Sequence, residues 1–225
     1  MPAVFVTSTG TDIGKTFVTA GLIRLMREQG AVVDALKPVV SGYDSSVAET
    51  SDPAVLLGAL GRAVSAEEIA RIAPWRFRAP LAPDLAAARE GRSIEFANLI
   101  EFSRTAISQA NGTLFIEGVG GVMVPLDAKR TVLDWIEALK IPALLVVGSY
   151  LGSISHTLTT LQVLADRNIP VAAIIVSESE PSAVSLDDTT QSILRFAPDT
   201  PVIAVPRLPA GVRYHAAFHQ IARLL

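Results

Sequence analysis

The sequence contains no cysteine among its 225 residues. This absence excludes disulfide bonds, a thiolate nucleophile and any metal site built on sulfur. Histidine is also scarce, and His156, His215 and His219 have no carboxylate at the spacing of a metal site. His215 and His219 are four residues apart in a predicted helix, where such a pair is usually structural, so we assign no histidine to catalysis.

The chain also lacks an excess of basic residues and any apolar run of membrane-spanning length. Its net charge is −3 with acids and bases interspersed, so we expect no nucleic-acid partner. Met1-Pro2-Ala3 leads directly into the first predicted strand, so we expect no signal peptide, no membrane partner and a cytoplasmic location. Half of the residues are hydrophobic, which is enough for the core of one α/β domain spanning residues 1–225.

Residues 4–16, VFVTSTGTDIGKT, carry a phosphate-binding pattern. The apolar run at 4–6 predicts a buried strand, a polar loop follows it, and Gly14-Lys15-Thr16 opens a helix. Loop amides and the positive helix end would face an anion, Lys15 would reach the terminal phosphates, and the Thr16 hydroxyl can ligate Mg²⁺. The usual pattern has a glycine where Thr9 stands, and the alternative is a chance Gly-Lys-Thr. The order of strand, loop and helix favours phosphate binding.

Short apolar runs alternate with segments of helical periodicity along the chain. Strands are predicted at 4–6, 31–36, 113–117, 143–147, 171–176 and 201–205. Helices are predicted to begin near 15, 52 and 65 and to span 93–110, 131–139, 153–168, 186–196 and 214–225. Residues 43–50 read as a surface loop, and the prolines within 74–84 exclude a regular helix there. The pattern is typical of a parallel sheet with helices on both faces, an α/β fold of the P-loop NTPase-like type.

Several polar residues follow the predicted strands, at the edge of the sheet where ligands bind in α/β proteins. Glu117 ends a buried strand, where an unpaired carboxylate is costly, and a Mg²⁺ ion shared with Thr16 would resolve this. Asp52, near a helix start, could supply a second carboxylate, and Lys37 could stabilise negative charge. The alternatives are a structural ion pair for Glu117, a helix-dipole role for Asp52 and a solvated surface position for Lys37.

Five stretches occur in an order and spacing that resembles the dethiobiotin synthetase family. They are the loop ending Gly14-Lys15-Thr16, KPVVSG at 37–42, Ser51-Asp52, EGVGG at 117–121 and residues 146–156. The resemblance covers essentially the whole chain, and the family's lengthened loop accounts for Thr9. It implies ATP- and Mg²⁺-dependent carboxylation of 7,8-diaminopelargonic acid in biotin synthesis. An amine takes up CO₂ (from bicarbonate) as a carbamate, ATP phosphorylates the carbamate, and the second amine closes the ring of dethiobiotin with loss of phosphate.

The resemblance also implies roles for individual residues. Lys15 and Lys37 would stabilise the carbamate and the transferring phosphoryl group, and Thr11 and Ser41 would position the diamine. Thr16, Asp52 and Glu117 would hold the metal. The protein would be a homodimer, and the neighbouring subunit would bind the substrate carboxylate through Leu151, Gly152, Ser153, Ile154 and Ser155. The nucleotide would contact Asp12, Ile13, Gly14, Lys15, Thr16, Phe17, Asp52, Glu117, Gly118, Val119, Gly120, Ser177, Glu178, Pro206, Arg207 and Leu208.

Three residues depart from the family's pattern. Ser8 replaces the first glycine of the loop, Ser177 replaces an asparagine that reads the adenine edge, and Asp84 stands where a histidine is common. A serine makes fewer simultaneous hydrogen bonds than an asparagine amide, so we expect relaxed nucleotide selectivity.

Two alternative functions remain compatible with parts of the pattern. A cobyrinic-acid amidotransferase-type synthetase would need a glutamine-hydrolysing domain, for which the chain has neither a cysteine nor spare length. A ParA/MinD-like switch ATPase usually has an additional lysine early in the loop, and Thr9, Gly10 and Thr11 offer none. The membrane-bound forms of such ATPases also end in a basic helix, whereas residues 214–225 contain only one arginine, Arg223.

Overall fold

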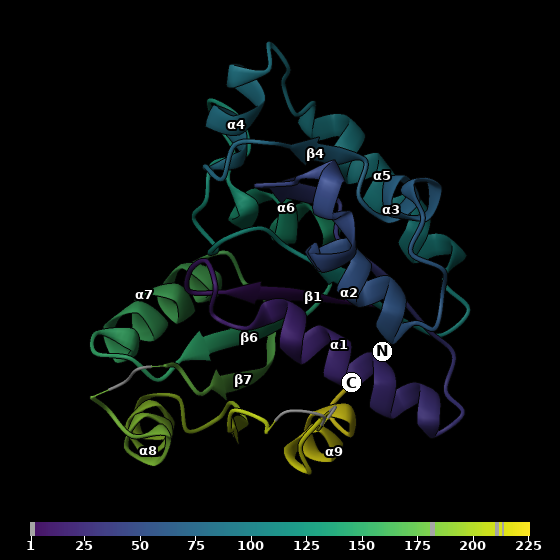
Figure 1. The fold of residues 1–225 in the computed structure, drawn as a ribbon. Coiled ribbons are helices and arrows are strands. Elements are labelled where there is room, and N and C mark those ends of the chain that lie inside the picture. Colours follow the sequence, from purple (N-terminus) through teal and green to yellow (C-terminus); the bar gives the residue numbers. More distant parts are fainter. Residues whose placement is uncertain (1–2, 181–182, 210–211, 213) are drawn as a thin grey trace.

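A parallel sheet forms the centre of the computed structural model, which describes residues 3–180, 183–209, 212 and 214–225 (Figure 1). Within these residues its strands are β1 (Ala3–Ser8), β2 (Val33–Leu36), β5 (Thr113–Glu117), β6 (Ala143–Gly148), β7 (Val171–Ser177) and β8 (Val202–Val205). They lie in the order β2-β5-β1-β6-β7-β8, and every neighbouring pair is parallel. The prediction of a parallel α/β sheet is therefore confirmed.

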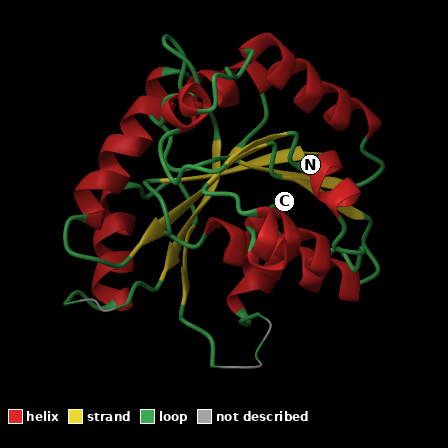
Figure 2. Ribbon diagram, turned by 45° about the horizontal axis from the view of Figure 1, so that its top comes forward, coloured by secondary structure: helices red, strands yellow, loops and turns green. Residues whose placement is uncertain are grey.

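Helices cover both faces of this sheet (Figure 2). They are α1 (Lys15–Glu28), α2 (Asp52–Ala59), α3 (Ala66–Ile72), α4 (Pro83–Arg89), α5 (Phe96–Gln109), α6 (Val132–Leu139), α7 (Ser153–Asp166), α8 (Leu186–Phe196) and α9 (Ala217–Ala222). Among the described residues, none of the helices has the length and apolar character needed to cross a membrane.

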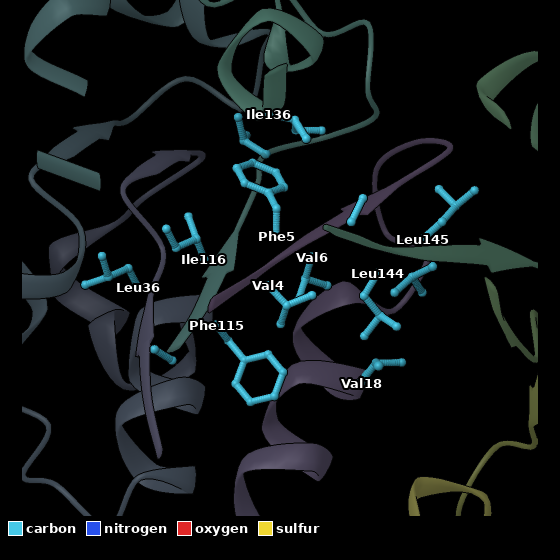
Figure 3. Close-up of a cluster of buried hydrophobic side chains, with 14 of the residues drawn as sticks. Val4, Phe5, Val6, Val18, Leu36, Phe115, Ile116, Ile136, Leu144 and Leu145 are labelled. Atoms are coloured by element: carbon cyan, nitrogen blue, oxygen red, sulfur yellow. The ribbon is translucent and has the colours of Figure 1, made fainter. Parts of the chain in front are cut away.

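Strand β1 supplies the core on both faces, because alternate side chains of a strand point in opposite directions. Val4 and Val6 point toward α1, whereas Phe5 points toward α6 and lies beside Ile136 (Figure 3). The ring of Phe5 meets that of Trp135 edge to face, with 4.8 Å between centroids. All of these side chains are buried, which explains why β1 reads as a continuous apolar run.

The structure contains elements that the sequence pattern missed. Strands β3 (Val39–Ser41) and β4 (Trp75–Phe77) form a separate parallel pair. Residues 74–82 form no helix, as predicted, but Pro83 is the first residue of α4, since proline is tolerated in a first turn. The predicted surface loop at 43–50 contains the 3₁₀ segment Ser45–Thr50.

Two predicted helix ends also need correction. Ser51 stands at the start of α2, but its hydroxyl donates to the Ala48 carbonyl instead of capping the helix. The predicted closing helix over 214–225 is reduced to α9; the His215 ring accepts the Ala217 amide hydrogen at its start, and before it Tyr214 packs its ring on Phe218 and donates its hydroxyl hydrogen to Glu28.

Burial predicts which phenylalanine supports the fold. Replacing the fully buried Phe115 of β5 with alanine should reduce the free energy of unfolding by about 3–5 kcal/mol, because a large cavity is left in the core. The matched control is Phe196→Ala at the end of α8, where the side chain is 66% exposed and the change should stay within about 0.5 kcal/mol. Urea unfolding followed by circular dichroism measures both, and equal losses would contradict the assignment of Phe115 to the core.

Candidate active site

The phosphate-binding loop connects the end of β1 to the start of α1 through two backbone positions of positive φ. Asp12 has φ 56° and Gly14 has φ 102°. A Cβ atom on Gly14 would lie 2.7 Å from the Ser177 hydroxyl oxygen, closer than two such atoms approach. The backbone conformation at position 14 therefore favours glycine, and a side chain there would also displace the Ser177 hydroxyl at the end of β7.

Lys15 is buried at the first position of α1 and is bound by oxygen atoms of the chain itself. Its Nζ donates to the Ser8 hydroxyl at 2.9 Å and to the carbonyls of Gly10 at 3.1 Å and Gly120 at 2.8 Å. Burial, and after it the nearby charge of Lys37, lowers the pKa of Lys15 from 10.5 to about 8. A phosphate group would supply the negative charge that this partly desolvated ammonium lacks.

A second cluster surrounds Lys37, which follows β2 directly. Its Nζ lies 2.6 Å from Glu117 Oε1 and 3.0 Å from Asp52 Oδ2, and it donates to the Gly118 carbonyl at 3.0 Å. Burial alone would lower the pKa of Lys37, but the carboxylates of Glu117 and Asp52 outweigh it and raise that pKa above 10.5. Burial acts in the opposite direction on Asp52, yet the charge of Lys37 holds the pKa of that carboxyl below 3.8.

The donor set of this cluster fits Mg²⁺. Glu117 is fully buried, and its Oε2 has no hydrogen-bond partner among the described residues. Its Oε1 accepts a hydrogen bond from the Thr16 hydroxyl at 2.6 Å, so the carboxylate and the hydroxyl lie together where one metal ion could contact both. The described residues contain no group of three or more His, Cys, Asp or Glu side chains that could enclose a metal. A hydroxyl and two carboxylates suit an ion that takes its other ligands from phosphate and water.

Two adjoining cavities open beside these residues. The first, of about 720 Å³, is lined by residues 11–17, Lys37, Ser41, Asp52, Val119, Gly120 and residues 80–83, among others. The second, of about 690 Å³, includes Ser177, Glu178, Pro206, Arg207 and Leu208. They share residues 12–14 and Phe17, so the loop separates them. Glu117 and Gly118 line neither cavity but join the first through their contacts with Lys37.

Comparison with known proteins identifies the family. The chain is 48% identical over 202 residues to the ATP-dependent dethiobiotin synthetase BioD of Acidiphilium cryptum, covering 89% of this chain and 91% of that protein. It is 49% identical to the enzyme of the same name from Methylobacterium nodulans, over 88% of this chain and 90% of the relative. The chain belongs to the dethiobiotin synthetase family. A family model described as an AAA domain also matches residues 2–213.

Solved structures agree on the fold of this dethiobiotin synthetase family member. The cell division ATPase MinD of Pyrococcus furiosus aligns with a TM-score of 0.56 and 14% identity, over 100% of this chain and 97% of that one. The hydrogenase maturation factor HypB of Archaeoglobus fulgidus aligns with a TM-score of 0.57 and 13% identity, over 98% and 86%. At such low identity these similarities establish the P-loop NTPase-like fold and nothing about the reaction.

One predicted segment lies outside both cavities. Residues 151–155 follow β6 and start α7, with Gly152 at φ 97°. Leu151 is 83% exposed, the largest exposed fraction among the exposed large hydrophobic side chains of the described chain. Within one chain, this dethiobiotin synthetase segment therefore contacts neither the phosphate loop cavity nor its neighbour.

Sequence reasoning also missed part of the cavity wall. Residues 80–83 line the first cavity because the Gly42 amide donates to the Ala79 carbonyl at 3.0 Å, which holds this loop against β3. Tyr150 and Ser179 line the second cavity. The one available signal was the pair Pro80 and Pro83, which interrupts regular secondary structure there. A pair of prolines does not indicate what the loop faces.

The lowered pKa of Lys15 predicts a pH dependence of stability. Between about pH 8 and pH 10.5 the folded protein binds fewer protons than the unfolded chain, so the contribution of Lys15 to stability rises with pH across this window. Relative to Lys15→Met, the wild type should gain on the order of 1–2 kcal/mol between about pH 7.5 and pH 9.5. Urea unfolding at both pH values measures this, and a constant difference between the two proteins would contradict it. Lys37, with a raised pKa, changes charge only above this window.

Proposed function

We propose that this protein is an ATP-dependent cyclo-ligase that converts 7,8-diaminopelargonic acid, CO₂ and ATP into dethiobiotin, ADP and phosphate. The observation that carries the proposal is the buried lysine pair at one cavity. Lys15 and Lys37 lie beside a phosphate-binding loop in a chain of the dethiobiotin synthetase family. We further propose that residues 1–225 act as one synthetase domain in the cytoplasm.

The proposed chemistry needs positioning and charge rather than a covalent nucleophile. The carbamate and the transferring phosphoryl group are both negative, and two lysine ammonium groups border the cavity in which they would meet. Lys15 would exchange its three neutral oxygen partners for phosphate oxygens. Lys37 would direct its charge at the carbamate, while Thr11 and Ser41, which line the same cavity, would orient the amines.

Thr16, Asp52 and Glu117 would hold a Mg²⁺ ion, which neutralises charge on the phosphate oxygens when bound. The unpartnered Glu117 Oε2 supports this assignment, since a fully buried carboxylate oxygen is costly without a partner. Asp52 is still partly exposed, so its carboxylate can reach an incoming ligand.

The second cavity would receive the nucleoside. It opens on the far side of the loop from Lys37 and includes the ends of β7 and β8. Glu178 accepts the Arg207 amide hydrogen at 2.8 Å, and this contact holds the two cavity walls together. Ser177 presents a hydroxyl where a family asparagine would present an amide, so the cavity offers fewer base-reading groups.

We also propose a homodimer whose sites are shared between subunits. The substrate carboxylate lies at the far end of an aliphatic chain and needs a partner. The free amides of a helix start can bind it, and the start of α7 is exposed at Leu151 and unused by the cavities of its own chain. A second copy could bring residues 151–155 to the mouth of the first cavity.

The reaction itself is tested by product formation. Phosphate release from ATP should require diaminopelargonate, bicarbonate and Mg²⁺ together, and dethiobiotin should appear in equal amount by mass spectrometry. Omission of any one component is the control. Rapid ATP hydrolysis without the diamine would contradict the synthetase proposal and favour a switch ATPase.

Shared sites are tested by subunit mixing. Gly152→Pro should raise the diamine KM and leave ATP binding intact, because proline cannot adopt the φ of 97° at this helix start. Mixed with a Lys37→Ala chain, it should restore activity in about half of the sites of each heterodimer, since one site then carries both lesions and the other none. No recovery after proven subunit exchange would mean that each chain builds its site alone.

A further inference from the structure

The ammonium of Lys37 occupies the carboxylates expected to hold the metal. Its three hydrogen-bonding partners are Glu117 Oε1, Asp52 Oδ2 and the Gly118 carbonyl, at 2.6, 3.0 and 3.0 Å. Because an ammonium has three N–H donors, this geometry uses all of them. Lys37 is only 3% exposed and Glu117 is fully buried, so the contact is shielded from water.

Binding a divalent ion and this ammonium to the same two carboxylates is electrostatically unfavourable. Two carboxylates carry two negative charges, whereas a divalent ion and Lys37 together carry three positive ones. The repulsion is strong in a buried site, where water screens it poorly. Lys15 lies nearby and adds a further positive charge, although it contacts neither carboxylate. A free metal ion would therefore meet carboxylates whose charge Lys37 already neutralises, with the ammonium of Lys15 close by.

The same ion arriving on a nucleotide brings its own negative charge. Phosphate oxygens would offset the metal and would also attract Lys15, leaving Lys37 as the cation to move. We propose that Lys37 keeps free divalent cations from binding Glu117 and Asp52. It is displaced from these carboxylates only by a metal that is bound to a polyphosphate. The displaced ammonium then points its charge into the first cavity, which Lys37 already lines. Lys37 is thus a residue that determines specificity for the metal–nucleotide complex. The identity of the nucleotide rests on the proposed function, whereas the competition between Lys37 and the metal for the carboxylates does not.

Mn²⁺ binding without nucleotide tests the exclusion. Free Mn²⁺ is measured by electron paramagnetic resonance for the wild type, Lys37→Gln and Lys15→Gln. We expect Lys37→Gln to bind Mn²⁺ at least about tenfold more tightly than the wild type, equivalent to about 1.4 kcal/mol. Lys15→Gln is the matched control, because it removes the same charge nearby without freeing a carboxylate, and its affinity should change by less than about threefold. Equal gains in both variants, or no gain in Lys37→Gln, would overturn the proposal.

A measurement on the wild type covers the case in which Lys37→Gln fails to fold. An amine-acylating reagent and peptide mass spectrometry report how accessible each lysine is. Lys37 should stay unlabelled without ligand and with Mn²⁺ alone, and should become labelled when Mn²⁺ is added together with a non-hydrolysable ATP analogue, with the exposed Lys129 as internal reference. Lys37 remaining protected while Mn²⁺ and the analogue are bound would show that the two cations coexist and would refute the exchange. Failure of dethiobiotin formation, measured separately, would instead refute the proposed reaction.

Discussion

The buried ion pair between Lys37 and Glu117 is the contact on which the site depends. Strand register creates it: Leu36 of β2 stands beside Ile116 of β5, so the next residues of the two strands emerge together at the carboxyl edge. Burying either charge alone would be strongly unfavourable, which links the pairing of two strands to the presence of both side chains. A slip of one residue in this register would turn the charged ends toward opposite faces.

A second set of contacts holds the resting site closed on its own atoms. The Ser8 carbonyl accepts the Val122 amide hydrogen, and the Ser8 hydroxyl contacts Gly10, Gly120 and Lys15. The loop after β1 is thereby joined to the glycine turn after β5. Both lysines of the first cavity are satisfied by the protein before any ligand arrives. Substrates must therefore supply better partners, which makes the charge of the ligands part of their recognition.

Local sequence patterns predicted the elements that depend on local physics. Strand β5 and helix α8 match their predicted bounds, because a buried strand needs an apolar run and a helix start needs a cap such as Ser185. The pair β3 and β4 was missed, since three residues carry too little periodicity to be read. The wall at residues 80–83 was missed for a different reason: a long-range hydrogen bond from the Gly42 amide to the Ala79 carbonyl holds it in place.

The sequence by itself determined the order along the chain of the six strands of the main sheet and most of its helices, the phosphate-binding loop and the charged residues available at the ends of the strands. Each follows from composition and spacing within a few residues. Only the tertiary structure decided which of those charges touch. Asp52 and Glu117 are far apart in the chain, and both meet Lys37 because α2 packs on α1 and β2 pairs with β5. The same folding leaves residues 151–155 outside the cavities of their own chain. The position of this helix start is set by the end of β6, which lies on the opposite side of β1 from β5 and β2.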